Sequence, residues 1–97
     1  MACILKVERR LKADILHFPS AVCNQIGTDL FSLQNNPLPP DRQDLDRPNG
    51  YYHQLPCGYF VSWELIGETE DILHLIASGA CRNLKIRILG AGASSPK

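Results

Sequence analysis

Residues 51–66 read YYHQLPCGYFVSWELI, and they constrain the fold more than any other stretch of the chain. They contain all three Tyr residues and the single Trp. Gly58 suits a tight turn, so the stretch predicts two strands folded about that glycine. Side chains alternate between the two faces of a strand, which splits the second arm into an apolar face and a mixed face. The apolar face carries Tyr59, Val61, Trp63 and Leu65, and the mixed face carries Phe60, Ser62, Glu64 and Ile66.

The segment before this hairpin predicts a short strand followed by two helices. Residues 2–7 are rich in strand-forming residues. Within residues 8–18, apolar side chains recur at helical spacing, and Pro19 ends that helix. Ser20 is a suitable N-cap for a second helix with an apolar stripe of its own. The first stripe is Leu11, Ile15 and Phe18, and the second is Val22, Ile26, Leu30 and Leu33.

The remaining segments complete an α+β pattern. Residues 35–50 are rich in Pro, Asn and Asp and predict a loop with a short strand at 42–45. After the hairpin, residues 72–79 predict a strand buried on both faces and therefore central in the sheet. A basic segment follows, and residues 91–97 are expected to form a frayed tail. We therefore expect one domain over 1–97, in which an N-terminal strand and a helical hairpin precede an antiparallel meander of three to four strands.

Charge and cysteine usage narrow the function classes. Ten basic and ten acidic residues balance, and the pI of about 6.8 argues against a strongly basic nucleic-acid binder. The N-terminus does not resemble a signal peptide, and no apolar run reaches the roughly 20 residues that cross a bilayer. We expect a cytoplasmic protein with reduced thiols, no cofactor and no metal site, because the Cys and His residues show no ligand spacing. The cysteines are Cys3, Cys23, Cys57 and Cys81.

The order of these segments resembles the RelE/ParE superfamily of bacterial toxin–antitoxin toxins, in particular its RelE-like branch. Three stretches carry the likeness: VERRLKADILHFPSAVCNQIGTDLFSLQNNPLPP, GYYHQLPCGYFVSWEL and ETEDILHLIASGACR. The resemblance implies a two-layer RelE/ParE-like fold and a toxin that is neutralised by an antitoxin wrapped around it. RelE-like members cut messenger RNA in the ribosomal A site without a metal. Their side chains therefore supply the acid–base chemistry and stabilise the reacting phosphate.

The basic positions of the RelE-like pattern are only partly matched. The strand before the turn holds Tyr52 and Gln54 in place of basic residues, and Phe60 stands where the pattern has Arg directly after Gly-Tyr. Arg82 comes one position later than the basic residue that follows the buried strand in the family. The C-terminal acid or base position falls near Arg87.

Transferred by position, the resemblance implies His53, Arg82 and Tyr52 as catalytic residues and Gln54, Lys85 and Arg87 as substrate-binding residues. His53 has an ordinary pKa of about 6.5 and suits a general base, while Tyr52 suits proton donation or stacking on a base. Tyr52, His53, Gln54 and Arg82, with Arg87, would line one concave face. In the alternative interpretation, this strand buries Tyr51 and His53 and shows Tyr52 and Gln54 to water.

The basic segment has two interpretations. If it is a strand, Lys85 and Arg87 share a face and Arg82 points away. If it is a helix, Arg82 and Lys85 are neighbours. Either pair suits a phosphate, and a solvated basic edge is the alternative.

Three functions remain open. The first is a toxin that inhibits translation as an endoribonuclease, with an antitoxin, the ribosome and messenger RNA as partners. The second is a non-catalytic binding protein on the same fold, either a ParE-like topoisomerase inhibitor or a degenerate toxin that only captures an antitoxin. The neutral charge and Phe60 favour this second class. The third is an unrelated α+β interaction domain. We expect a homodimer or a toxin–antitoxin hetero-oligomer and no membrane partner.

Overall fold

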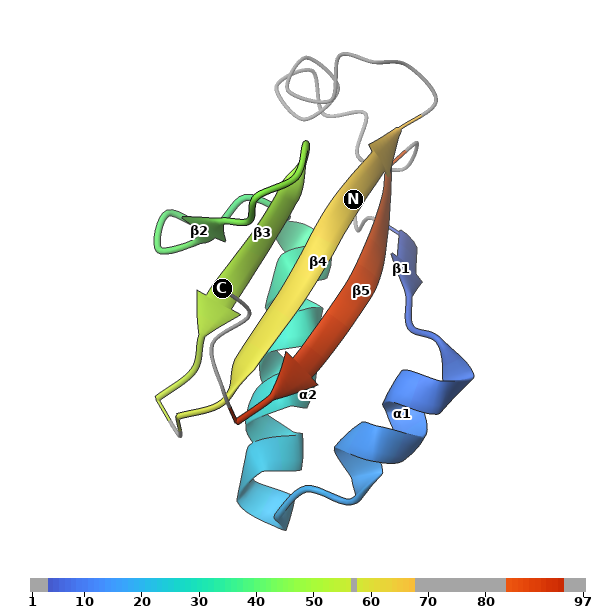
Figure 1. Ribbon diagram of the computed structural model, residues 1–97, viewed down its shortest axis with the longest axis vertical. Helices are drawn as coiled ribbons and strands as arrows, with labels where there is room; N and C mark the ends of the chain where they lie inside the picture. The colour runs from blue at the N-terminus through green and yellow to red at the C-terminus, as the bar shows by residue number, and fades with distance from the viewer. Residues whose placement is uncertain (1–3, 57, 68–83, 94–97) are drawn as a thin grey trace.

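A computed structural model describes residues 4–56, 58–67 and 84–93, which form two helices and five strands (Figure 1). The predicted α+β order, with a strand and two helices before a meander, is confirmed. The elements are β1 (Ile4–Lys6), α1 (Arg9–Leu16), α2 (Ser20–Asn35), β2 (Gln43–Asp44), β3 (Gly50–Gln54), β4 (Phe60–Gly67) and β5 (Leu84–Gly92).

The strands form one mixed sheet in the order β1-β5-β4-β3-β2. Strands β2 to β5 pair antiparallel in sequence as the predicted meander, whereas β1 pairs parallel to β5. Parallel neighbours need a long crossover connection, and here the rest of the chain supplies it. The first and the last described strands thereby become neighbours at one edge of the sheet.

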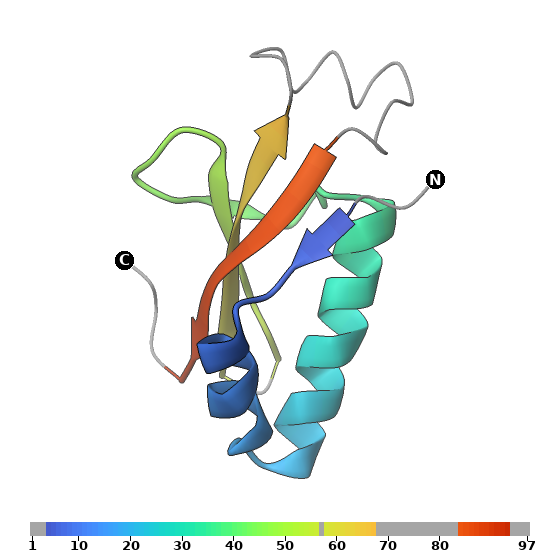
Figure 2. The ribbon, with the colours of Figure 1, turned by 90° about the vertical axis from the view of Figure 1, so that its right-hand side faces the viewer.

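One face of the sheet is covered by α2, which crosses behind β3 and β4 in Figure 1, while α1 lies beside β5 (Figure 2). The predicted stripe on α2 supplies three buried residues, and the apolar face of β4 is almost fully buried, with Trp63 at 0% exposure. Neither of the two described helices covers the opposite face, which we call the open face. The core cluster is Val22, Ile26, Leu33, Leu55, Val61, Trp63, Leu65, Leu84, Ile86 and Ile88.

Several local predictions need correction. Pro19, in an extended conformation, is the N-cap of α2, so Ser20 is the first helical residue and not the cap. Strand β5 continues through Gly92, two residues into the tail that was expected to fray. The predicted strand at 72–79 lies outside the described residues, and β4 occupies the centre of the described sheet between β3 and β5.

The hairpin turn is confirmed at Gly58, whose φ of 84° lies in the left-handed region that glycine adopts without strain. The turn is closed by the Leu55 amide, which donates to the Tyr59 carbonyl at 2.7 Å, and by the Gly58 amide, which donates to the Leu55 carbonyl at 3.1 Å. The tight turn fixes the register of β3 against β4 and therefore decides which face each side chain occupies.

Trp63 ties the loop after α2 to the centre of the sheet. Its Nε1 donates to the Pro37 carbonyl at 3.2 Å, and its ring lies 6.2 Å from that of Tyr51. Both Trp63 and Pro37 are buried. The hydrogen bond therefore satisfies a carbonyl that water does not reach.

We predict that Trp63→Phe lowers the free energy of unfolding by about 1–3 kcal/mol, because the Pro37 carbonyl loses its donor inside the core. Urea denaturation of the purified protein measures the change. Phe31 is 67% exposed on α2, so Phe31→Leu serves as the control, with an expected change within about 0.5 kcal/mol. Equal effects of the two substitutions would contradict this role for Trp63.

Candidate functional site

The open face around β3 carries Tyr52 and Gln54, as the alternation predicts. Tyr52 lies opposite Gln43 on β2, and its hydroxyl donates to Gln43 Oε1 at 2.6 Å. Tyr52 is only 6% exposed, so the expectation that the open face shows it to water is wrong. Gln54 is exposed and donates from Nε2 to the Tyr59 carbonyl at 2.9 Å. These contacts hold both side chains in fixed positions at the hairpin end of the sheet.

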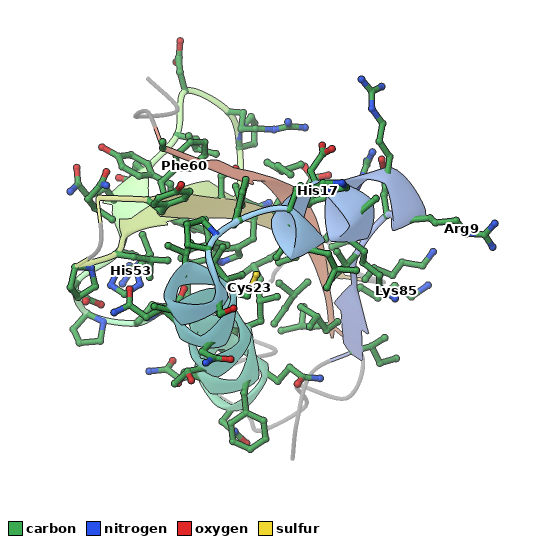
Figure 3. The ribbon with its side chains drawn as sticks, turned by 90° about the horizontal axis from the view of Figure 1, so that it is seen from below. Arg9, His17, Cys23, His53, Phe60 and Lys85 are labelled. Carbon is green, nitrogen blue, oxygen red and sulfur yellow. The ribbon has the colours of Figure 1, made fainter. Side chains whose placement is uncertain are left out.

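The hairpin end of the open face is aromatic and uncharged among the described residues. Phe60 lies on the side of the sheet away from α2 (Figure 3) and opposite Gly92 of β5. A Cβ on Gly92 would approach the Phe60 ring to 3.3 Å, so the glycine leaves room for that ring. Ser62 donates to the Gly90 carbonyl at 3.3 Å. The position where the RelE-like pattern has Arg is therefore filled by a packed ring.

The opposite end of the open face is charged. Strand β5 is confirmed as a strand, so Lys85 and Arg87 share a face, and both are exposed. The guanidinium of Arg87 donates to Glu64 at 3.3 Å and to Glu8 at 3.2 Å. Glu64 also pairs with Arg47 at 2.9 Å. Arg82 lies outside the described residues, so its place relative to this group stays a prediction.

The side chain of His53 lies on the helix side of the sheet, opposite to the open face. Its Nδ1 lies 2.8 Å from Asp29 Oδ1 of α2, and its Nε2 lies 2.6 Å from Asp41 Oδ2 in the loop after α2. The expectation that His53 lines one face together with Tyr52 and Gln54 is therefore wrong. Successive side chains of a strand point to opposite faces, and the helix side is the one that offers carboxylates to His53.

The two carboxylates favour the charged imidazolium. Burial lowers the pKa of His53, but hydrogen bonds and charges from Asp29 and Asp41 raise it by more, so the pKa of His53 is raised above its ordinary value. The pKa of Asp29 is also raised, because burial outweighs its contact with His53. Both ring nitrogens are engaged, so His53 links α2, the loop and β3, and has no free nitrogen to serve as a general base.

The partners of His53 are residues that sequence analysis missed. Asp29 lies three residues after Ile26 and four before Leu33, within the apolar stripe of α2. A carboxylate on a buried stripe needs a partner, and this was the available signal. Asp41 gave no comparable signal, because it lies in a Pro-rich loop with other acidic residues.

No metal centre or membrane span emerges from the described residues. Across 4–56, 58–67 and 84–93, no three His, Cys, Asp or Glu side chains are placed to hold a metal ion. Neither described helix has the length and apolar character needed to cross a bilayer.

Comparison with known proteins supports the fold. No family model and no curated protein sequence matches the chain. The intact E. coli RelBE toxin–antitoxin complex matches with a TM-score of 0.72 and 17% identity, covering 97% of this chain and 99% of the matched chain. Isolated E. coli RelE toxin matches with a TM-score of 0.70 and 15% identity, covering 99% of this chain and 88% of the matched chain.

A mutant of E. coli RelE in the free state, in which two arginines are replaced by alanine, also matches. Its TM-score is 0.69 and its identity is 17%, and the match covers 95% of this chain and 83% of the matched chain. These likenesses support a two-layer α+β fold in which helices pack beside a single sheet. More particularly, the chain has the fold of the RelE toxin, as the resemblance in sequence implied.

We predict that Asp29→Asn destabilises the protein more at about pH 6 than at about pH 9. The pKa of His53 is raised on folding. The contribution of charged His53 to the free energy of unfolding is therefore fully present below the ordinary histidine pKa of about 6.5. That contribution is lost as the pH rises through the folded value. The measurements are urea unfolding at both pH values and the pKa of His53 by NMR, which should fall in the variant.

Asp46→Asn is the matched control, because Asp46 is exposed and the structure gives it no side-chain hydrogen bond or ion pair among the described residues. An Asp29→Asn variant that loses the same free energy at both pH values would contradict the charged pair.

Proposed function

We propose that this chain is the toxin component of a type II toxin–antitoxin module and that it inhibits translation by cutting ribosome-bound messenger RNA. The observation that carries the proposal is the fold match to the E. coli RelBE complex, which spans 97% of this chain and 99% of the matched chain. The exposed cations Lys85 and Arg87 at one end of the open sheet face further support an RNA-facing role.

We assign a separate role to each candidate residue on the open face. Tyr52 lies on this face with its hydroxyl fixed by Gln43, and it supplies proton transfer. Gln54 positions the substrate, and Lys85 and Arg87, at the opposite end of this face, bind the substrate away from the reacting phosphate. Arg82 joins them in the proposal through its place in the sequence. His53 leaves the catalytic set, because both of its nitrogens are held by carboxylates on the helix side.

An apolar groove between α1 and α2 supports an antitoxin as the partner. The groove has a volume of about 300 Å³, and a Cβ on Gly27 in its floor would meet no atom within 4 Å. Leu16 at its rim is 78% exposed. Exposed apolar side chains around a groove are typical of protein interfaces. The apolar lining residues are Val7, Ile15, Leu16, Cys23, Ile26 and Leu30.

The second candidate is a non-catalytic binding protein on the same fold, such as a degenerate toxin that captures an antitoxin or a ParE-like topoisomerase inhibitor. The specific observation in its favour is the uncharged hairpin end, where Phe60 packs over Gly92. An enzyme that cuts RNA with side chains alone needs charge close to the reacting phosphate.

We predict that induced expression of the protein in bacteria arrests growth, cuts messenger RNA in translating ribosomes and is relieved by a co-expressed antitoxin. Tyr52→Phe should lower the rate of cleavage by about 10²-fold or more, because it removes the hydroxyl and keeps the ring. Primer extension on cellular messenger RNA measures cleavage.

Tyr59→Phe is the matched control, since Tyr59 packs against the core and its ring centroid lies 5.1 Å from that of Phe18. It should leave cleavage unchanged. A wild-type protein that leaves growth and translation untouched would contradict the toxin proposal. Growth arrest with intact messenger RNA and altered DNA supercoiling would favour the topoisomerase route.

A further inference from the structure

A second cavity lies on the open face at the β1 end of the sheet, and we call it the basic pocket. Its volume is about 430 Å³, and it is lined by Lys6, Val7, Glu8, Ile66, Lys85 and Arg87. We propose that the basic pocket binds a phosphodiester group of single-stranded nucleic acid. The identity of this ligand as RNA rests on the proposed function.

Strand pairing assembles the pocket from distant parts of the sequence. The parallel register of β1 on β5 sets Lys6 beside Arg87, and the antiparallel register of β4 sets Ile66 beside Lys85. Ile86, between the two basic residues of β5, is buried on the helix side. Alternation therefore places Lys6, Ile66, Lys85 and Arg87 together on the open face. Figure 3 shows Lys85 and His53 at opposite sides of the molecule.

Two of the three cations in the pocket have no carboxylate partner among the described residues. Within the described ranges, the structure gives the side chains of Lys6 and Lys85 no hydrogen bond or ion pair, and both residues are exposed. Arg87 is already engaged, because its two terminal nitrogens donate to Glu64 and Glu8. The free positive charge of the pocket is therefore carried by two ammonium groups.

This arrangement suits a phosphate better than a carboxylate. A carboxylate is bound best by the planar fork of an arginine, which donates two parallel hydrogen bonds to its oxygens. The fork of Arg87 is occupied by two carboxylates of the protein itself. Lysine binds a phosphate as a point charge from many directions. Ile66 is 41% exposed and gives the pocket an apolar wall against which a ribose can pack.

Glu8 acts as a competing anion in the pocket. It is held through a single contact with Arg87 at 3.2 Å, and its side chain is 64% exposed. Glu64 is far more buried, at 14%, and is also held by Arg47, so it stays in place when a ligand enters. When a phosphate approaches, Glu8 swings into solvent and one nitrogen of Arg87 becomes available. Removing the charge of Glu8 should therefore strengthen binding.

The test uses the purified full-length chain and a short fluorescent single-stranded RNA with 2′-O-methyl groups, which cannot be cut through its 2′-oxygen. Fluorescence anisotropy over a range of salt concentrations gives the affinity and its salt dependence. We expect Lys6→Ala and Lys85→Ala each to weaken binding by about three- to tenfold and to reduce the salt slope by about 0.7. Glu8→Gln should strengthen binding by a similar factor.

Lys12→Ala is the matched control, because it removes the same charge from α1 and Lys12 does not line the basic pocket. It should change the affinity by less than about twofold. Circular dichroism and thermal unfolding establish that each variant is folded. Single-stranded DNA of the same sequence should bind comparably, because the pocket contacts the phosphodiester group.

Three results would overturn the proposal: equal weakening by all three Lys variants, no gain from Glu8→Gln, or competition by poly-glutamate as effective as by RNA. The last result would identify an acidic peptide as the ligand. Because the RNA analogue resists cleavage, this test is independent of activity. A non-toxic chain that loses RNA affinity through Lys6→Ala would defeat the proposed function and leave the basic pocket standing.

Discussion

The parallel pairing of β1 with β5 is the contact on which the rest of the molecule depends. It joins residues from opposite ends of the chain, with Lys6 in register with Arg87. The strand is only three residues long, and pairing of that length is weak unless packing supports it. Leu5, in the middle of β1, packs against the hydrophobic core and gives that support. The register then fixes where α1 begins and builds the edge that carries the basic pocket.

Local patterns predicted the elements well, because each pattern reflects burial on one face. The alternation in β4 identified Val61, Trp63 and Leu65 as core, and the helical stripe on α2 identified Val22, Ile26 and Leu33. Pairing between distant segments does not produce a comparable pattern in the sequence. Nothing in residues 2–7 shows that they pair with β5, and nothing near His53 points to Asp41. Those contacts depend on how the elements pack, which single-segment periodicity does not encode.

Several basic side chains are paired with carboxylates within the fold. Arg47, Arg87 and His53 are each matched by carboxylates. A surface ion pair adds little stability by itself. Its larger effect here is to cancel the field that an approaching anion would meet. The open face consequently presents little net charge over most of its area, although its sequence contains several basic residues.

The two ends of the open face therefore differ in chemistry. At the hairpin end, hydrogen bonds fix the Tyr52 hydroxyl and the Gln54 amide, and Phe60 adds an aromatic ring. At the β1 end, Lys6 and Lys85 offer charge. A nucleic-acid strand that lay along the face would have its phosphate held at the charged end and its bases stacked at the aromatic end. In such an arrangement, affinity and chemistry come from different ends of one sheet. Under the proposed function, Phe60 in place of the arginine of RelE-like toxins would weaken catalysis more than binding.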